Sequence, residues 1–239
     1  HRRLADGTTQ YFKSVIDAKL VTPGGMALTL ATETLTNEGH EVFDKQDCEL
    51  KAFGRLAAKL RALFPRTPLV LLLDSLYANQ TAIRLVEAHH WKYVVNFKEG
   101  SMPERFAEAM ALMGLQPENA LRTAFRGVPQ SFRWTRDLPV AEFAPAAIEC
   151  LEYPPDREPI RFVWLTNFPI TPKNVSEIAN HGGRLRWKIE NEGFNAQKND
   201  GFAMAHPFSE HPNGSRVFYV LLLIAHLLSQ LILHGSLIE

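Results

Sequence analysis

Apolar and polar positions in the first part of the chain have the spacing of short strands followed by a long helix. The stretches "LADGTTQYF", "SVIDAKLV" and "MALTLATE" have the pattern of strands, and the Pro-Gly-Gly sequence at 23–25 predicts a hairpin between the last two. "DKQDCELKAFGRLAAKLRALFP" has apolar residues at helical spacing and ends in a proline. We therefore predict an antiparallel start and then a helix.

The middle of the chain has the pattern of a parallel unit. "PLVLLLD" is an apolar run that ends in a carboxylate, which predicts a strand buried on both faces. Residues 78–91 predict a helix, and "KYVVNF" predicts another strand. Because strands that alternate with helices form parallel sheets, the whole pattern predicts an α/β fold with a mixed sheet flanked by helices.

The pattern changes after Gly100. A helix is predicted at 103–114, and the strands "QSFRWTRD", "AIECLEY" and "IRFVWLTNF" follow, separated by proline-rich and charged turns. We interpret residues 100–167 as a β-rich insertion. Helices are expected to return at Thr171, with Pro172 in the first turn after a capping hydroxyl.

The stretch "VFYVLLLIAHLLSQLILH" at 217–234 is about the minimum length for a membrane span. His226, Ser229 and Gln230 interrupt it, and no aromatic or cationic belt follows it. We therefore expect a buried C-terminal helix and no membrane partner, with a membrane anchor as the alternative.

Composition narrows the class of protein. The 239 residues are 46% apolar, enough for one large domain with a core or for two small ones. The formal net charge is zero, so a polyanion would have to be held by a local patch. Two distant cysteines, Cys48 and Cys150, indicate a reducing compartment such as the cytoplasm. The chain begins at His1 without a leader, which we interpret as a fragment and not as a secreted precursor.

Three acids are candidate metal ligands. Asp6 belongs to the first predicted strand, although Asp-Gly is also a common turn sequence. Asp74 ends a predicted buried strand, where ligand sites of α/β sheets collect, or else it caps the next helix. Glu190 comes from the late helical stretch "GRLRWKIENEGFNAQKN". Carboxylates brought together in this way suit Mg²⁺ or Mn²⁺. Four histidines, His89, His90, His206 and His211, lack zinc spacing and are expected at the surface or in loops.

The segments "ADGT", "LLLDSLYANQ", "FVWLTNFPI" and, above all, "RWKIENEGFNAQK" resemble the catalytic domain of bacterial DDE transposases of the insertion-sequence-four type, the group that includes the Tn-five transposase. The resemblance covers nearly the whole chain. It implies a single ribonuclease-H-like domain over residues 1–239, with the β-rich insertion at 100–167 between the second aspartate and the glutamate. The acids of the triad would be Asp6, Asp74 and Glu190.

The transposase signature around the glutamate is Tyr, two residues, Arg, three residues, Glu, six residues, Lys. Arg186 and Glu190 match it, but the tyrosine position falls on Gly183 and the lysine comes one residue late, at Lys198. A local bulge at Gly193 would absorb this slip.

A second glutamate competes with Glu190 for the triad position. An alignment anchored on Phe194 favours Glu192, whereas the Arg-x-x-x-Glu spacing favours Glu190, and we choose the latter. Arg186 and Glu190 then lie one turn apart on the same face of a helix.

The resemblance implies metal-dependent cleavage of DNA at transposon ends, followed by strand transfer into target DNA, with two Mg²⁺ or Mn²⁺ ions as cofactors. It further implies a homodimer in the synaptic complex and a bacterial, cytoplasmic protein that joins the nucleoid when bound to DNA. The expected DNA contacts are the cations near the glutamate: Arg184, Arg186, Lys188 and Lys198.

Three alternatives stay open: a ribonuclease-H-like metal nuclease without strand transfer, a catalytically decayed DNA-binding descendant, and a membrane-tethered structural protein. Trp134 and Trp164 of the β-rich segment could stack on a displaced base, but such residues more often belong to a core.

Overall fold

Strands and helices alternate through most of the chain, as the pattern predicts. The computed structural model describes residues 2–3, 6–7, 9–10, 14–35, 45–206, 208–209 and 211–235. The strands are β1 (Arg2–Arg3), β2 (Thr9–Gln10), β3 (Val15–Val21), β4 (Ala27–Thr34), β5 (Val70–Leu73), β6 (Lys92–Asn96), β7 (Ala120–Phe125), β8 (Val128–Thr135), β9 (Ala146–Glu152) and β10 (Ile160–Thr166). The helices are α1 (Lys45–Leu63), α2 (Gln80–Ala88), α3 (Pro103–Leu115), α4 (Val175–His181), α5 (Ala196–Asn199) and α6 (Pro212–His234), with the 3-10 turns η1 (Ser75–Tyr77) and η2 (Gly183–Arg186) and the π-helix η3 (Ile189–Asn195).

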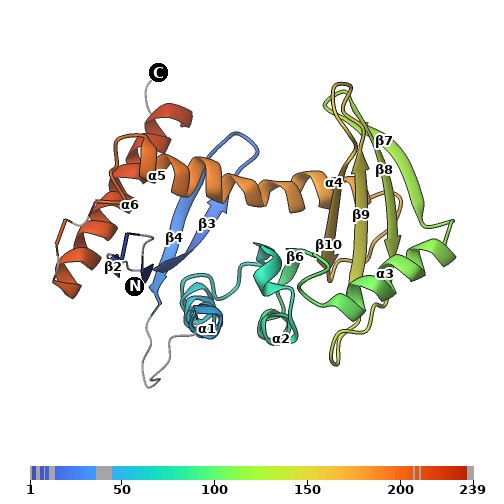
Figure 1. Cartoon of the computed structure of the whole chain (residues 1–239), viewed down its shortest axis with the longest axis horizontal. Coiled ribbons are helices and arrows are strands. Elements are labelled where there is room, and N and C mark those ends of the chain that lie inside the picture. The colour runs from blue at the N-terminus through green and yellow to red at the C-terminus, as the bar shows by residue number, and fades with distance from the viewer. Residues whose placement is uncertain are drawn as a thin grey trace.

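A six-stranded mixed sheet in the order β5-β6-β10-β9-β8-β7 forms the larger part of the fold (Figure 1). Only β5 and β6 are parallel, and the four later strands are antiparallel to their neighbours. The predicted mixed sheet is therefore confirmed. The β-rich segment continues the same sheet through the pairing of β10 with β6, and it contains one strand, β7, that the pattern did not predict.

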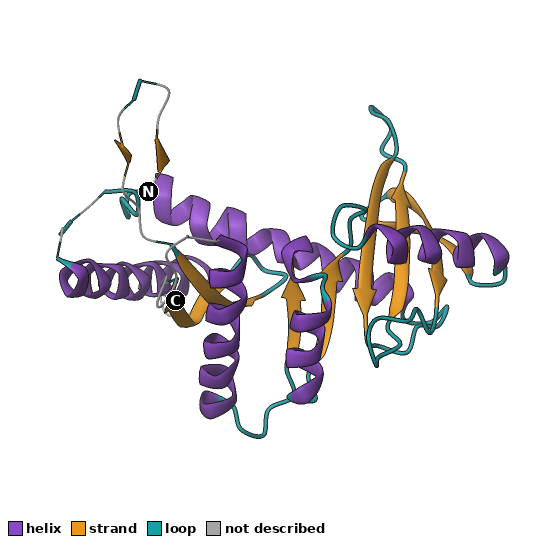
Figure 2. Cartoon of the chain, turned by 60° about the horizontal axis from the view of Figure 1, so that its bottom comes forward, coloured by secondary structure: helices purple, strands orange, loops and turns teal. Residues whose placement is uncertain are grey.

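Helices cover both faces of this sheet because its strands alternate their side chains between two cores. Tyr93 and Val95 of β6 face the core that includes α1, α2 and α3, whereas Val94 faces the core that includes α4. In Figure 2, α3 lies across the strands on one side. The arrangement is an α/β fold that is compatible with the ribonuclease-H-like prediction.

The strand β5 differs from the prediction of a strand buried on both faces. It occupies the edge of the six-stranded sheet, and Val70 at its start is 49% exposed. The apolar run thus predicted the strand correctly, but it did not predict that the strand lies at the edge of the sheet.

The hairpin of β3 and β4 forms as predicted around the turn at 23–25, where Gly25 has a φ of 102° that favours glycine. It makes a two-stranded sheet of its own and is not hydrogen-bonded to the six-stranded sheet. Helix α1 packs against this hairpin. The antiparallel start is therefore confirmed, but as a separate layer.

The late helical stretch forms a rod that runs from the six-stranded sheet to the β3–β4 hairpin (Figure 1). The rod was predicted to begin at Thr171, but α4 begins at Val175. The reason is local: the side chain of Asn174 accepts from the backbone N–H and the hydroxyl of Thr171 and donates to the carbonyl of Pro169, which holds a turn before the helix.

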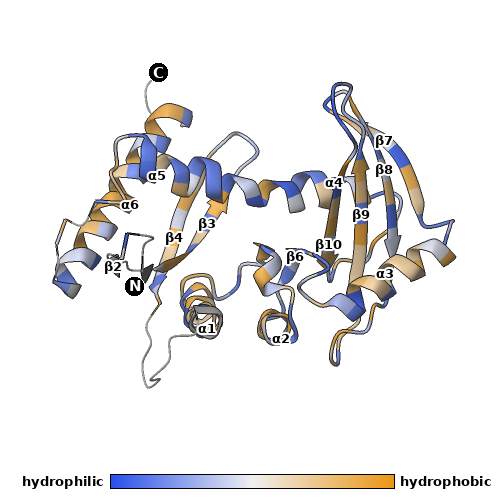
Figure 3. Ribbon diagram, viewed as in Figure 1, coloured by the Kyte–Doolittle hydropathy of each residue, from blue (hydrophilic) through white to orange (hydrophobic). Residues whose placement is uncertain are grey.

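Helix α6 contradicts the prediction of a buried C-terminal helix. Within the described residues it is the one helix long and apolar enough to cross a membrane, and 17% of its most apolar stretch is buried. Figure 3 shows apolar residues along its length. Leu222, Leu223, His226 and Gln230 are buried, whereas the exposed apolar residues are Val217, Phe218, Val220, Leu221, Ile224, Leu228, Ile232 and Leu233. A narrow side of the helix contacts the hairpin and η3. A single apolar helix of this kind is weak evidence of a membrane segment.

Close packing of the rod on the sheet yields the first prediction. A Cβ at Gly183 would lie under 3.0 Å from the indole ring of Trp164, a fully packed residue. We expect Gly183→Ala to lower the free energy of unfolding by about 1–3 kcal/mol, because the core must shift to admit the methyl group. Gly54→Ala is the matched control: it lies within α1 with nothing within 4 Å of the added Cβ, and it should stabilise by up to about 1 kcal/mol. Denaturant unfolding measures both, and equal effects would contradict the packing.

Candidate functional site

Asp74 follows β5 and caps the turn η1. Its Oδ1 accepts from the backbone N–H of Leu76 at 2.9 Å, which is the capping role considered from the sequence. Burial and the nearby carboxylates of Glu49 and Asp74 raise the pKa of Tyr77, whose hydroxyl donates to Glu49 at 3.1 Å. Asp74 lies at the carboxyl end of a strand that is parallel to its neighbour, as expected.

Asp6 was predicted in a strand, but it lies in a turn between β1 and β2 and is exposed. These two strands pair with each other in a separate two-stranded sheet. The Asp-Gly sequence explains this correction, because Gly7 has a φ of 84° and such sequences favour turns. The structure therefore supplies no strand pairing that would bring Asp6 beside Asp74.

Glu190 and Arg186 form an ion pair on the rod. Nη1 of Arg186 donates to Oε1 of Glu190 at 3.0 Å, one turn away, as the four-residue spacing predicts. The glutamate side chain is 47% exposed, whereas that of Arg186 is 11% exposed and its guanidinium lies over Trp187. The carboxylate thus faces solvent while its partner is held in the protein.

Glu192, the rival of Glu190, is bound inward. Its carboxylate accepts from Lys188 at 2.6 Å, and its backbone carbonyl accepts from Gln230 of α6 at 3.0 Å. Its second oxygen, Oε2, is buried without a hydrogen-bond partner among the described residues. Glu192 therefore helps to join the rod to α6.

The predicted bulge at Gly193 is present as the π-helix η3. A π-helical turn holds an extra residue compared with an α-helical turn, so residues beyond it are displaced by about one position. Lys198 follows this turn, is exposed, and has no ion pair with an acid in the described ranges. The single-helix prediction is wrong in detail, since 3-10, π and α turns succeed one another along the rod.

Gly183, at the position where the resemblance would place a tyrosine, has no space for a larger side chain. The ring of Trp164 fills the space beside its Cα, so no larger side chain fits without a shift of the core. Trp134 and Trp164 are 0% and 2% exposed, so both belong to the core and are not available for base stacking.

The guanidinium of Arg184 forms an ion pair within the protein. It pairs with the buried Glu152 of β9, and its guanidinium lies over the ring of Phe162. Burial opposes ionisation of Glu152, but hydrogen bonds from Arg184 and Gln130 outweigh it and hold the pKa of this carboxyl below its ordinary value. The arrangement ties the rod to the sheet, so Arg184 has a structural role in addition to the predicted DNA contact.

A buried charged cluster around Lys19 was not predicted. The side chains of Asp17 and Lys19 are fully buried with Nζ and Oδ2 3.0 Å apart, and Tyr219 of α6 donates to Asp17 at 2.7 Å. Burial lowers the pKa of Lys19, while Asp17 acts in the opposite direction. Lys19 also lies over Phe194 and against Gly193 of η3. The alternation of polar residues in "SVIDAKLV" was the available signal, since residues two apart share one strand face.

The described residues do not assemble a metal centre. No three His, Cys, Asp or Glu side chains within them lie close enough to hold an ion, so Asp6, Asp74 and Glu190 are not gathered in this arrangement. Three of the four histidines expected at the surface or in loops, His90, His206 and His211, are exposed, and the fourth, His89, is half-buried beside Trp91.

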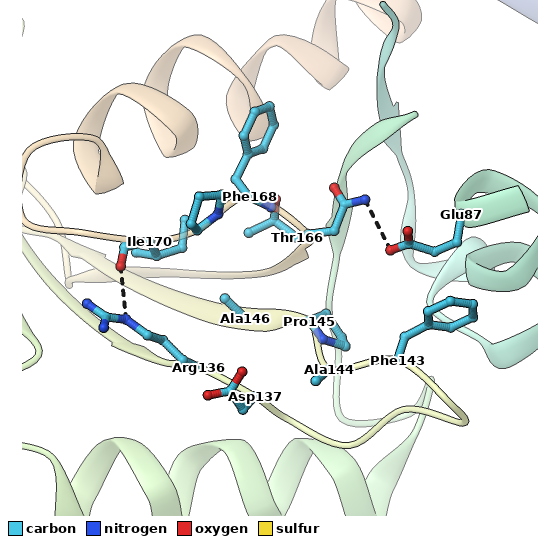
Figure 4. A pocket seen from close by; sticks show the side chains of 12 residues that line it. Glu87, Arg136, Asp137, Phe143, Ala144, Pro145, Ala146, Thr166, Phe168 and Ile170 are labelled. Carbon is cyan, nitrogen blue, oxygen red and sulfur yellow. Dashed lines mark hydrogen bonds between the residues drawn. The ribbon is translucent and has the colours of Figure 1, made fainter. Parts of the chain in front are cut away.

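A cavity of about 290 Å³ lies beside the end of β10 and contains none of the predicted site residues (Figure 4). Two of its polar side chains are engaged: Nε of Arg136 donates to the carbonyl of Ile170 at 3.0 Å, and the amide of Asn167 donates to Glu87 at 3.1 Å. The first bond ties Arg136 to the segment after β10, and the second ties that segment to α2.

Comparison of the sequence with protein-family models and with curated proteins gives no match.

The Lys19 cluster yields the second prediction. Lys19→Met leaves the buried carboxylate of Asp17 without its cation, so we expect it to lower the free energy of unfolding by about 3–5 kcal/mol. The double variant Asp17→Asn, Lys19→Met removes both charges and should recover most of this loss. Denaturant unfolding with a double-mutant cycle measures the coupling, and a single-variant cost below about 1 kcal/mol would show that the pair does not stabilise the fold.

Proposed function

We propose that this chain is the catalytic domain of a DDE transposase, which cleaves DNA at transposon ends and joins the freed strand to target DNA. The observation that carries the proposal is the helical segment from Arg186 to Lys198. It combines the Arg186–Glu190 pair of the signature with a π-helix that accounts for the late lysine. The ion pair concerns the arginine and glutamate positions of the signature, and the π-helix concerns its lysine position.

Exposure favours Glu190 over Glu192 as the third acid. A carboxylate that holds a metal ion against a DNA phosphate has to face solvent, and the side chain of Glu190 is 47% exposed. The side chain of Glu192 is 32% exposed, one of its carboxylate oxygens is buried, and its backbone contacts α6. The proposed triad is therefore Asp6, Asp74 and Glu190.

Mg²⁺ or Mn²⁺, in a pair of ions, belongs to the proposal as the cofactor, because carboxylate oxygens are the ligands that these cations prefer. When bound, such ions activate water and stabilise the leaving oxygen in phosphoryl transfer. Among the described residues no three such side chains are placed to hold an ion: Asp74 caps η1 through Oδ1, and Asp6 lies in the β1–β2 hairpin. We therefore derive no catalytic step through the ions.

Lys198 is the best-suited DNA contact of the four predicted cations, because it is exposed and carries no ion pair within the described residues. Arg184, Arg186 and Lys188 are each paired with a glutamate and would have to exchange that partner for a phosphate.

The proposal also includes a homodimer in the synaptic complex, a bacterial cytoplasmic location, and a ribonuclease-H-like fold with an insertion at 100–167. A nuclease without strand transfer and a decayed DNA-binding descendant are the alternatives.

The third prediction tests the glutamate. Glu190→Gln keeps the side-chain volume and removes one charge, so we expect Mg²⁺-dependent cleavage of a plasmid that bears the element's own ends to fall by about a hundredfold or more. DNA binding should be unchanged or slightly stronger. Glu192→Gln is the matched control, two residues away, and should change cleavage far less.

The reverse ranking of the two variants would move the third acid to Glu192. Joined products from the parent protein support a transposase, cut but unjoined plasmid supports a nuclease, and absence of both in a protein that binds DNA supports a decayed descendant.

A further inference from the structure

A charged groove of about 370 Å³ is lined by residues of β4, α1 and α6, and β4 contacts both helices. Figure 1 shows both helices beside the β3–β4 hairpin. The charged residues that line the groove are Arg55 and Lys59 of α1, Arg216 of α6 and Glu33 of β4. Three cations against one acid give the groove an excess of positive charge in a chain whose formal net charge is zero. Such a local patch is what a neutral protein needs in order to hold a polyanion.

Glu33 orients two of these cations. Its side chain is 12% exposed and accepts from Nε of Arg55 at 3.1 Å and from Nζ of Lys59 at 2.6 Å. The same cations also donate to backbone carbonyls of β4, Arg55 to Thr34 and Lys59 to Thr32. Burial opposes ionisation of Glu33, but the hydrogen bonds from Lys59 and Arg55 outweigh it and hold its pKa below the ordinary value.

The two cations are thus pre-organised without being covered, because their side chains remain 44% and 53% exposed. Part of each group is free to bind a ligand in the groove. Pre-organisation of this kind lowers the entropy lost when a ligand binds.

Arg216 completes the groove from the opposite side. It is exposed in the second turn of α6 and has no ion pair with an acid in the described part of the chain. A guanidinium presents a planar set of donors that matches phosphate oxygens. Tyr219 and Val220 beside it supply an apolar wall, against which a sugar or a base can lie.

We propose that this groove binds phosphate groups of a DNA strand, at a position separate from the proposed triad. The inference rests on the proposed function for the identity of the strand. It assigns Arg55, Lys59 and Arg216 to backbone contact, which positions DNA without reading its sequence.

The fourth prediction concerns Arg216→Gln, which removes one charge from a side chain without intramolecular ion pairs among the described residues and so leaves folding intact. Anisotropy of a labelled DNA duplex, measured over a range of salt concentrations, should give a log–log slope that is smaller by about 0.9. This corresponds to about an eightfold loss of affinity at 0.1 M salt relative to 1 M salt. Arg122→Gln, at an exposed position on β7 of the six-stranded sheet, is the matched control and should keep the parent slope.

The outcomes separate this inference from the proposed function. A parent-like slope for Arg216→Gln, or an equal loss for Arg122→Gln, overturns the groove and leaves the proposed function standing. A parent protein that does not bind DNA at low salt contradicts both. Inorganic phosphate is the second probe: if Arg216→Gln abolishes its binding but leaves DNA binding unchanged, the groove is a small-anion site and the inference is wrong.

Discussion

The buried ion pair of Asp17 and Lys19 determines how the hairpin, the helical rod and α6 meet. The hairpin has no hydrogen bonds to the six-stranded sheet, so its position depends on side-chain contacts with its neighbours. Lys19 contacts η3 through Phe194 and Gly193, and Asp17 receives the hydroxyl of Tyr219 from α6. Oδ2 of Asp17 has Lys19 and Tyr219 as partners, and Lys19 also donates to Thr29, whereas Oδ1 of Asp17 is buried without a partner among the described residues. The loss of either charge would leave the other uncompensated.

This cluster also contacts the rod. Gly193 lies against Lys19, and the backbone carbonyl of Glu192 accepts from Gln230 of α6. The carboxylates of Glu190 and Glu192 pair along the rod with Arg186 and Lys188, and the side chain of Glu190 is the more exposed, 47% against 32%. The choice of Glu190 by the spacing rule stays a prediction.

Sequence patterns predicted the local elements well where their signals were local. The helix α1, the turn at 23–25 and the strands β8 to β10 follow from periodicity and turn residues alone. The burial of β5 and of α6 was predicted wrongly, because an apolar run shows that burial is possible but not which neighbours cover it. The start of α4 was missed because Asn174 and Thr171 form a local turn that competes with the helix.

The candidate site also has one part that local sequence patterns predict and another part that they do not. The Arg186–Glu190 pair and the bulge at Gly193 are local to one stretch and could be predicted. The relation of Asp6 to Asp74 depends on how β1 and β2 are placed beside the main sheet, which no local pattern determines.

The most direct measurement of that relation is iron-mediated cleavage of the protein backbone, with Fe²⁺ in place of Mg²⁺ on the DNA-bound chain. Three acids in one site predict cuts near residues 6, 74 and 190, all suppressed by added Mg²⁺. Cuts that omit any one of these positions, or that Mg²⁺ does not suppress, would contradict a shared site.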